Sequence, residues 1–181
     1  GRILGIGFFG SGLGAGAARF MPDGTLDTTF NGDGIAHFNP NGGYFAAAKG
    51  HLLSNGKIII TAYSTNSASE NHFHAIQLDS TGALDTTYGN GGSYYDALLP
   101  VTPFSVNVAS SIDGNGNLVM SGSLDNSNVA VLRLTPSGVP DVTFGMHLLN
   151  ARYSFGFSAA QLFEASAKIG SDAYNNYTVD R

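Results

Sequence analysis

Apolar and polar residues alternate in three short segments that recur along the chain. The segments are residues 17–21 (AARFM), 74–79 (HAIQLD) and 129–135 (VAVLRLT). Period-2 alternation puts the apolar side chains on one face of an extended segment, which is the pattern of a half-buried β-strand. Each of the three segments is therefore predicted to be a strand.

A more apolar segment precedes each of these strands and opens with a glycine. These segments are residues 1–7, 56–63 and 116–123. Apolar, β-branched runs bounded by Gly-containing turns predict buried strands. Further strands or short extended pieces are predicted at 34–38, 44–53, 91–95 and 103–112. Residues 158–169 (SAAQLFEASAKI) include helix-forming residues, but their place in the repeat matches 103–112, so they are interpreted as a strand.

A turn motif occurs three times at a nearly constant spacing. Its copies are PDGTLDTTF (22–30), STGALDTTY (80–88) and PSGVPDVTF (136–144). The aspartates are 58 and then 56 residues apart, and the glycines and closing aromatic residues keep the same spacings. The residues in register are Gly24, Asp27, Phe30, Gly82, Asp85, Tyr88, Gly138, Asp141 and Phe144. Three position classes in register indicate a structural repeat.

Each class has a predicted structural role. Glycine adopts positive φ without a Cβ penalty, which suits a tight turn. Aspartate accepts hydrogen bonds from following backbone N–H groups, and the neighbouring threonines extend that turn. The aromatic residues are predicted to fill the gap between neighbouring sheets. All nine residues are interpreted as structural, and no catalytic, cofactor-binding or metal-binding residue is predicted.

The repeat unit predicts the architecture. About four strands in under sixty residues fit one blade of a β-propeller. The expected fold is therefore all-β: a single repeat region over residues 1–181, with repeat turns at 22–34, 80–92 and 136–145, built of four-stranded antiparallel blades. The alignment indicates about three repeats, as two complete and two partial blades. Propellers usually have 4–8 blades, so we expect a longer protein, a ring of two copies in which a C-terminal strand completes the partner's first blade, or an open stack.

Two of the repeats resemble a known family. IQLDSTGALDTTYGNGG (76–92) and LRLTPSGVPDVTFG (132–145) are similar to delta-60 repeats, a bacterial β-propeller repeat. Its pattern places a basic or polar residue in the strand before Asp-Gly-x-Leu-Asp-x-x-Phe-Gly-x-x-Gly, a position held here by Arg19, Gln77 and Arg133. The third copy departs from the pattern at Val139-Pro140 and lacks the trailing Gly-Gly. The resemblance implies a propeller of secreted or surface proteins, with no established catalytic residues.

Composition narrows the function classes. The net charge is −5 and no basic stripe is present, so nucleic-acid binding is not expected. The chain has no cysteine, which excludes disulfide and thiolate chemistry. Charged residues make up only 12%, and a surface rich in Asn, Ser, Thr and Gly is typical of secreted or surface-exposed proteins. No run approaches the ~18 apolar residues of a membrane helix, so no membrane insertion is expected.

Two patterns faintly suggest metal binding. His72 and His74 would share one face of a strand, with Glu70 near in sequence, but a polar loop entering a strand explains the same letters. The segments 31–34 (NGDG) and 113–117 (DGNGN) resemble calcium loops without the bidentate glutamate. Asn-Gly hairpins give the same pattern and are the favoured interpretation.

Three further features carry less weight. Residues 5–17 contain a Gly-x-Gly spacing, but a strand is predicted on each side, which favours a loop over a dinucleotide site. The sequon at Asn176 matters only in a eukaryotic secretory setting. Several tyrosines are predicted at loop edges, namely Tyr44, Tyr63, Tyr94, Tyr95 and Tyr153. The chain has no tryptophan, which weakens a sugar-stacking hypothesis.

These observations favour a non-enzymatic secreted or cell-surface scaffold that binds a protein or glycan and uses no cofactor. The alternative is a self-assembling structural subunit of an extracellular fibre, or of a multimeric ring completed by strand exchange. An enzyme with its site at a central channel is a third possibility, because fold alone does not determine function.

Overall fold

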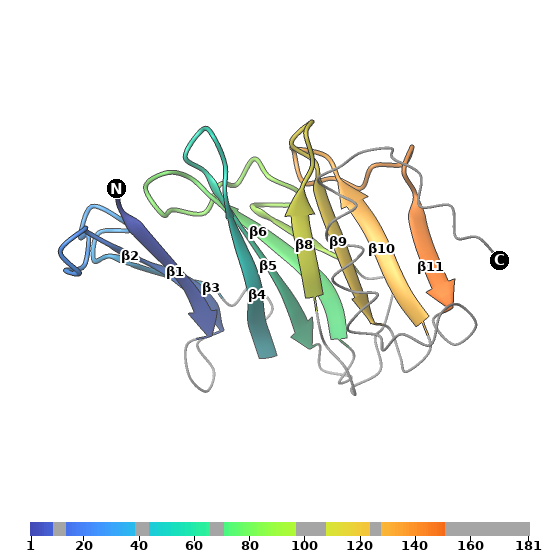
Figure 1. The fold of residues 1–181 in the computed structure, drawn as a ribbon, viewed down its shortest axis with the longest axis horizontal. Helices are drawn as coiled ribbons and strands as arrows, with labels where there is room; N and C mark the ends of the chain where they lie inside the picture. The colour runs from blue at the N-terminus through green and yellow to red at the C-terminus, as the bar shows by residue number, and fades with distance from the viewer. Residues whose placement is uncertain (9–13, 39–43, 66–70, 97–107, 124–127, 151–181) are drawn as a thin grey trace.

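The computed structural model describes residues 1–8, 14–38, 44–65, 71–96, 108–123 and 128–150. Within these ranges all regular structure is β, arranged as three antiparallel sheets side by side along the long axis of the molecule (Figure 1). This arrangement confirms the predicted all-β, propeller-type array. The described sheets form an open row and not a closed ring.

Each sheet is one blade. The first blade contains β1 (Ile3–Phe8), β2 (Ala15–Phe20) and β3 (Ile35–Phe38), in that order. The second contains β4 (Tyr44–Leu52), β5 (Ile58–Thr65), β6 (Asn71–Leu78) and β7 (Ser93–Tyr95), also in sequence order. The third contains β8 (Val108–Ile112), β9 (Leu118–Ser123), β10 (Asn128–Leu134) and β11 (Met146–Asn150), again in sequence order.

The strand predictions agree closely with these blades. The alternating segments correspond to β2, β6 and β10, and the more apolar segments to β1, β5 and β9. Two blades have four described strands, and the first has three, without a strand at the position of β4 or β8. The strand predicted at 158–169, the further partial blade and Asn176 lie outside the described residues.

Alternation along each strand gives every blade two apolar faces. Ile58 and Ile60 of β5 face the first blade, whereas Ile59 between them faces the third. We call the layer between the first and second blades the first seam. Its main residues are Ala15, Ala17, Phe30 and Ala36 from the first blade, and Ile58, Ile60, Ala62, Ile76 and Leu78 from the second.

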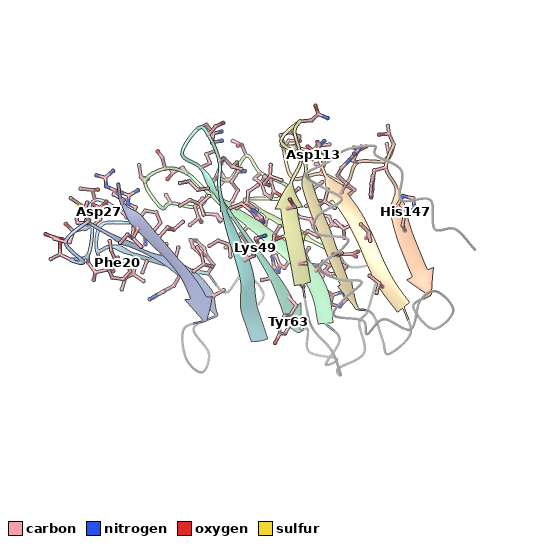
Figure 2. The ribbon with its side chains drawn as sticks, viewed as in Figure 1. Phe20, Asp27, Lys49, Tyr63, Asp113 and His147 are labelled. Carbon is pink, nitrogen blue, oxygen red and sulfur yellow. The ribbon has the colours of Figure 1, made fainter. Side chains whose placement is uncertain are left out.

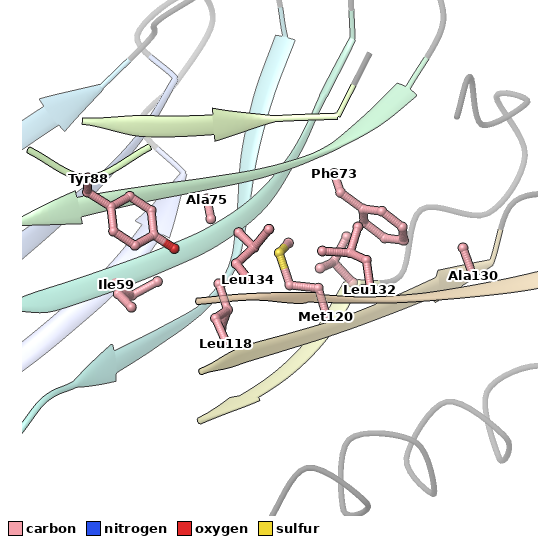
Figure 3. Close-up of a cluster of buried hydrophobic side chains, with 10 residues drawn as sticks. Ile59, Phe73, Ala75, Tyr88, Leu118, Met120, Ala130, Leu132 and Leu134 are labelled. Atoms are coloured by element: carbon pink, nitrogen blue, oxygen red, sulfur yellow. The ribbon is translucent and has the colours of Figure 1, made fainter. Parts of the chain in front are cut away.

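The layer between the second and third blades is the second seam. There Ile59, Phe73, Ala75 and Tyr88 meet Val108, Leu118, Met120, Ala130, Leu132 and Leu134 (Figure 3). The opposite face of the third blade carries a smaller buried cluster of Val119, Val129 and Val131, with Phe144 packed against it. Burial of apolar side chains between successive sheets is therefore what holds the blades together.

Candidate functional site

The three repeat turns form the same hydrogen-bonded corner. Asp27 Oδ1 accepts hydrogen bonds from the Thr29 N–H (3.1 Å) and the Thr29 hydroxyl (2.5 Å). The second and third corners repeat both contacts between Asp85 and Thr87 and between Asp141 and Thr143. These are the Asx-type turns expected of a short acidic side chain followed by threonine.

The third corner keeps this geometry despite its proline. In each corner the aspartate N–H donates to a strand carbonyl, from Asp27 to Arg19 and from Asp141 to Arg133, both at 2.8 Å. The hydrogen bonds that join the corner to the strand are made by the residues on either side of the one that precedes the aspartate. That residue therefore contributes no N–H to them. Pro140 therefore occupies that position without removing a bond, and it pairs with Leu134 as Leu26 pairs with Phe20.

Two of the three corner glycines, Gly82 and Gly138, lie against an aromatic ring of the preceding blade. Gly82 and Gly138 have φ of 91° and 79°, and a Cβ on either would lie 2.7 Å from a ring atom. The ring over Gly82 is Phe30 and the ring over Gly138 is Tyr88, and both rings are buried. Only glycine provides both the positive φ and the space.

The third aromatic residue differs from the first two. Phe144 is half-buried, and it contacts its own blade's valine cluster and the His147 ring, whose centroid is 4.9 Å away. In the first blade, the corner glycine Gly24 is exposed, whereas Gly82 and Gly138 are buried. The structure thus brings four of the nine repeat residues together in seams between described blades, Phe30 with Gly82 and Tyr88 with Gly138, and leaves Phe144 half-buried.

Every corner aspartate pairs with a cation, but the cation comes from one or both of two strand positions. In the third blade it is the arginine of the second-last strand, with Arg133–Asp141 at 2.7 Å, and in the first blade both positions contribute, with Arg19–Asp27 at 2.7 Å and Arg2–Asp27 at 2.6 Å. In the second blade Gln77 occupies the position on the second-last strand, and Lys57 from the start of β5 pairs with Asp85 at 2.6 Å.

These contacts keep the corner carboxylates ionised. Hydrogen bonds from Lys57 and Thr87 lower the pKa of Asp85 to about 2. The Thr143 and Arg133 hydrogen bonds lower the pKa of Asp141 to about 2. The carboxylates therefore act as fixed acceptors and ion-pair partners at neutral pH.

The His-x-His pair is part of the blade interior. Both imidazoles are buried, His72 Nδ1 lies 2.6 Å from the Asp96 carbonyl oxygen, and the Tyr95 ring centroid is 4.8 Å from His72 and 5.6 Å from His74. Burial, with the His72 charge, lowers the pKa of His74 to about 4. Glu70 lies outside the described residues, and among those described no three His, Cys, Asp or Glu side chains form a metal-binding group.

The two calcium-like segments are turns closed by their own aspartates. Asp113 Oδ1 accepts the N–H groups of Asn115 and Asn117, each at 2.9 Å. Asp33 Oδ1 accepts the Ile35 N–H at 2.8 Å. Their side-chain oxygens therefore have the hairpin role that the sequence favours.

The glycine-rich segment 5–17 runs from β1 into β2, as its strand-flanked context predicts, with residues 9–13 outside the described ranges. Tyr63, Tyr94 and Tyr95 are half-buried residues near the ends of strands β5 and β7. Their cross-strand packing covers the rings. Tyr44 lies in β4, and Tyr153 is not among the described residues.

A cleft of about 720 Å³ opens between the second and third blades. The hairpins that join β4 to β5 and β8 to β9 border it, and Figure 2 shows Lys49 and Asp113 on these two blades. Its lining is mixed, with Lys49, His51, Asn55, Lys57, Gln77, Asp113 and Asn115 beside Leu52, Leu53, Ile112 and Pro136. Leu52 is 69% exposed.

A network of hydrogen-bonded polar side chains lies beside this cleft, and the sequence did not predict it. The Ser110 hydroxyl is 2.8 Å from both His51 Nε2 and Thr61 Oγ1, and Lys49 Nζ donates to the Ser110 carbonyl at 2.9 Å. Burial, with the Lys49 charge, lowers the pKa of His51 to about 4. Lys49 and His51 are two residues apart on the predicted strand 44–53. This spacing indicates that their side chains share one face of the strand.

Comparison with known proteins supports the propeller assignment. The model of a family described as a domain of unknown function (DUF5122) beta-propeller matches residues 1–30 and 53–88. The two segments cover β1, β2 and the first corner, and then β5, β6 and the second corner. No curated protein matches the chain. The described residues contain no helix with the length and apolar character needed to cross a membrane. The chain therefore carries β-propeller repeats.

Proposed function

We propose that this chain is a non-enzymatic propeller scaffold of the delta-60 kind, secreted or displayed at a cell surface, and that it binds a segment of another protein in the cleft of the second seam. The observation that carries the proposal is the lining of that cleft. Exposed Leu52 lies beside amide and ammonium groups, and among the described residues no Phe or Tyr lines the cleft, whose ring is the His51 imidazole.

The lining favours a peptide segment over a glycan. Sugar sites in proteins commonly stack the ring on an aromatic side chain, and the cleft walls are aliphatic and polar instead. Lys57 is paired with Asp85, so Lys49, whose Nζ donates to the Ser110 carbonyl, is the ammonium group of the lining that favours an acidic ligand. The expected ligand is an extended segment that combines aliphatic with acidic side chains.

The polar groups of the repeats support a non-catalytic role. Asp27, Asp85 and Asp141 are occupied by their own turn and by a cation, and His74 is buried within a blade. A general acid or base must reach a substrate proton. The low-charge surface rich in Asn, Ser, Thr and Gly supports a secreted or surface location.

A defined peptide array tests the proposal. Extended peptides that alternate Leu or Ile with Asp or Glu are compared with Lys-substituted versions, and affinity is measured by fluorescence anisotropy. Leu52→Asn and Lys49→Glu are expected to weaken binding, while Val139→Asn, a 47% exposed residue outside the cleft, leaves it unchanged. No binding to any acidic peptide, or equal binding by Leu52→Asn, would contradict the proposal, and hits confined to a glycan array would replace it.

A further inference from the structure

Asn-Gly pairs occur five times in the chain, and asparagine followed by glycine is prone to spontaneous loss of its side-chain amide. The pairs begin at Asn31, Asn41, Asn55, Asn90 and Asn115, and Asn41 lies outside the described residues. In this reaction the backbone nitrogen of the glycine attacks the side-chain carbonyl carbon of the asparagine, and glycine has no Cβ to hinder the approach. Because the following residue is the same at every site, the local structure decides which asparagine reacts.

The two hairpins beside the cleft engage the attacking nitrogen. Gly56 N–H and Gly116 N–H each donate to a carbonyl oxygen of their own turn, at 2.9 Å and 3.0 Å. Asn55 Oδ1 also accepts the Lys57 N–H at 3.0 Å, which holds the asparagine side chain. These hydrogen bonds must break before the glycine nitrogen can attack, and breaking them costs free energy. The hairpin geometry therefore protects both sites.

Asn31 is restrained through its own side chain. Asn31 Nδ2 donates to the Ile35 carbonyl at 2.9 Å, and Asn31 N–H donates across the first seam to the Thr81 carbonyl at 2.6 Å. The side-chain amide must leave the first of these hydrogen bonds before its carbon can turn towards the Gly32 nitrogen. Both the backbone and the amide group that would leave are therefore held in place.

Asn90 lacks these restraints. It is exposed, and within the described part of the chain neither its side-chain amide nor the Gly91 N–H has a hydrogen-bond partner. The turn is closed on either side of the pair instead, by Asn90 N–H to the Ser93 carbonyl at 2.7 Å and by Gly92 N–H to the Tyr88 carbonyl at 2.8 Å. The Ser93 hydroxyl also donates to the Asn90 carbonyl oxygen at 3.4 Å. That contact stabilises the negative charge that this peptide group carries once the Gly91 nitrogen has lost its proton.

We propose that Asn90 is a modification site, at which the folded chain converts its own asparagine to an aspartyl or isoaspartyl residue. The Gly91 nitrogen gives its proton to solvent and forms a bond to Asn90 Cγ. The bond from Cγ to the amide nitrogen breaks, and ammonia leaves with a proton taken from water, so that a succinimide ring remains. Water then adds to one of the two ring carbonyl carbons, and the bond from that carbon to the ring nitrogen breaks. The sum is asparagine plus water giving the acid plus ammonia, with no change in oxidation state.

The product is compatible with the folded blade. Among the described residues no contact of the fold depends on the Asn90 side chain. The neighbouring hydrogen bond of the second seam, from Gly89 N–H to the Ser137 carbonyl at 2.7 Å, does not involve either residue of the pair. The new carboxylate lies in solvent and makes the net charge, already −5, more negative. Modified protein is therefore expected to accumulate in the folded form, independently of the cleft and its ligand.

Peptide mapping of the whole chain by mass spectrometry tests the site. Folded protein and protein in concentrated urea are incubated at the same mildly alkaline pH, and the conversion of each Asn-Gly pair is followed with time. In the folded protein, Asn90 is expected to convert several-fold faster than Asn55 and Asn115, and faster than Asn31. In urea the rates at these sites are expected to converge, because all of them have the same following residue.

Matched variants separate the reacting residue from its surroundings. Asn90→Gln is expected to abolish the conversion at that position, because the longer side chain closes a ring slowly, and Asn115→Gln is expected to leave the rate at Asn90 unchanged. A rate at Asn90 in the folded protein no higher than the rates at Asn55 and Asn115 would overturn the proposal. The same ranking in urea as in the folded protein would also overturn it, because the order would then follow from the sequence and not from the turns.

Discussion

The two seams use the same corner but differ in what surrounds the aromatic ring. In the first seam the Arg19 guanidinium lies 4.6 Å from the centroid of Phe30 and reaches across to the next blade. In the second seam Gln77 stands at the arginine position, and the ring is Tyr88. Both seams share the glycine beneath the ring and a backbone hydrogen bond beside it. This bond runs from Asn31 N–H to the Thr81 carbonyl (2.6 Å) in the first seam and from Gly89 N–H to the Ser137 carbonyl (2.7 Å) in the second, so these two features set the spacing of the blades.

The side chains inside the two seams differ, although the corners set the same spacing of the blades. β1 packs closely on β4 in the first seam, where a Cβ on Gly50 would lie 2.5 Å from Ile6. In the second seam, Thr61 and Ser110 place hydroxyls between β5 and β8. A polar cleft is thus compatible with one seam of an array whose corners share the same Asx turn and positive-φ glycine.

Phe30→Ala is expected to have the largest effect. Removing a fully buried phenylalanine costs about 3–5 kcal/mol of unfolding free energy, because the first seam loses its ring and Arg19 loses its stacking partner. Phe144→Ala, at a half-buried ring, is expected to cost about 1 kcal/mol. Urea denaturation measures both, and equal losses would show that the corners are not distinguished by a covering blade.

Gly138→Ala compared with Gly24→Ala separates backbone strain from packing. Both glycines have positive φ (79° and 87°), so each substitution costs about 1 kcal/mol in strain. At Gly138 the added Cβ also lies 2.7 Å from the Tyr88 ring and from the Gly89 nitrogen, which raises the expected loss to about 3 kcal/mol.

Thermal or urea unfolding of the monomeric protein gives this difference. A loss at Gly24 as large as that at Gly138 in dilute solution would contradict the assignment of an open corner.

Two histidines with lowered pKa, His74 and His51, predict a pH dependence of stability. Burial lowers the pKa of His74 from 6.5 to about 4, so the unfolded chain binds a proton in a range where the folded chain does not. Stability is therefore complete above pH 6.5 and falls as the pH drops to about 4, by up to about 3 kcal/mol. His74→Phe is expected to reduce this slope and to leave the part that His51 contributes. An unchanged slope in His74→Phe would assign the titration to other groups.

Sequence periodicity anticipated the blades because short-range chemistry determines them. Alternation, Gly-bearing hairpins and the Asp-Thr corner each specify a local conformation, and the structure has all three at the expected residues. Contacts between blades depend on which strand lies opposite. Ser110 joins Lys49 and His51 across about sixty residues, and no spacing in the sequence pairs them.

The cation that pairs with Asp85 is another contact that the sequence pattern did not predict. Gln77 interrupts the basic position of the repeat, and only the fold shows that Lys57 supplies the charge to Asp85 instead. Half-burial of Tyr63, Tyr94 and Tyr95 has a similar origin, because neighbouring strands cover rings that the sequence places near loops.

Tyr88→Phe has the smallest expected effect and the opposite sign. Phe30 and Phe144 hold this position in the other two repeats, and in the part of the chain that the structure describes the buried Tyr88 hydroxyl has no hydrogen-bond partner. Burial of that hydroxyl raises the Tyr88 pKa, and an unsatisfied buried polar group costs free energy that its removal restores. We expect Tyr88→Phe to gain about 1 kcal/mol in urea unfolding while leaving the ring over Gly138. A loss of stability would mean that the hydroxyl has a partner in the folded protein, and the second seam would then differ from the first through Tyr88 as well as through Ser110.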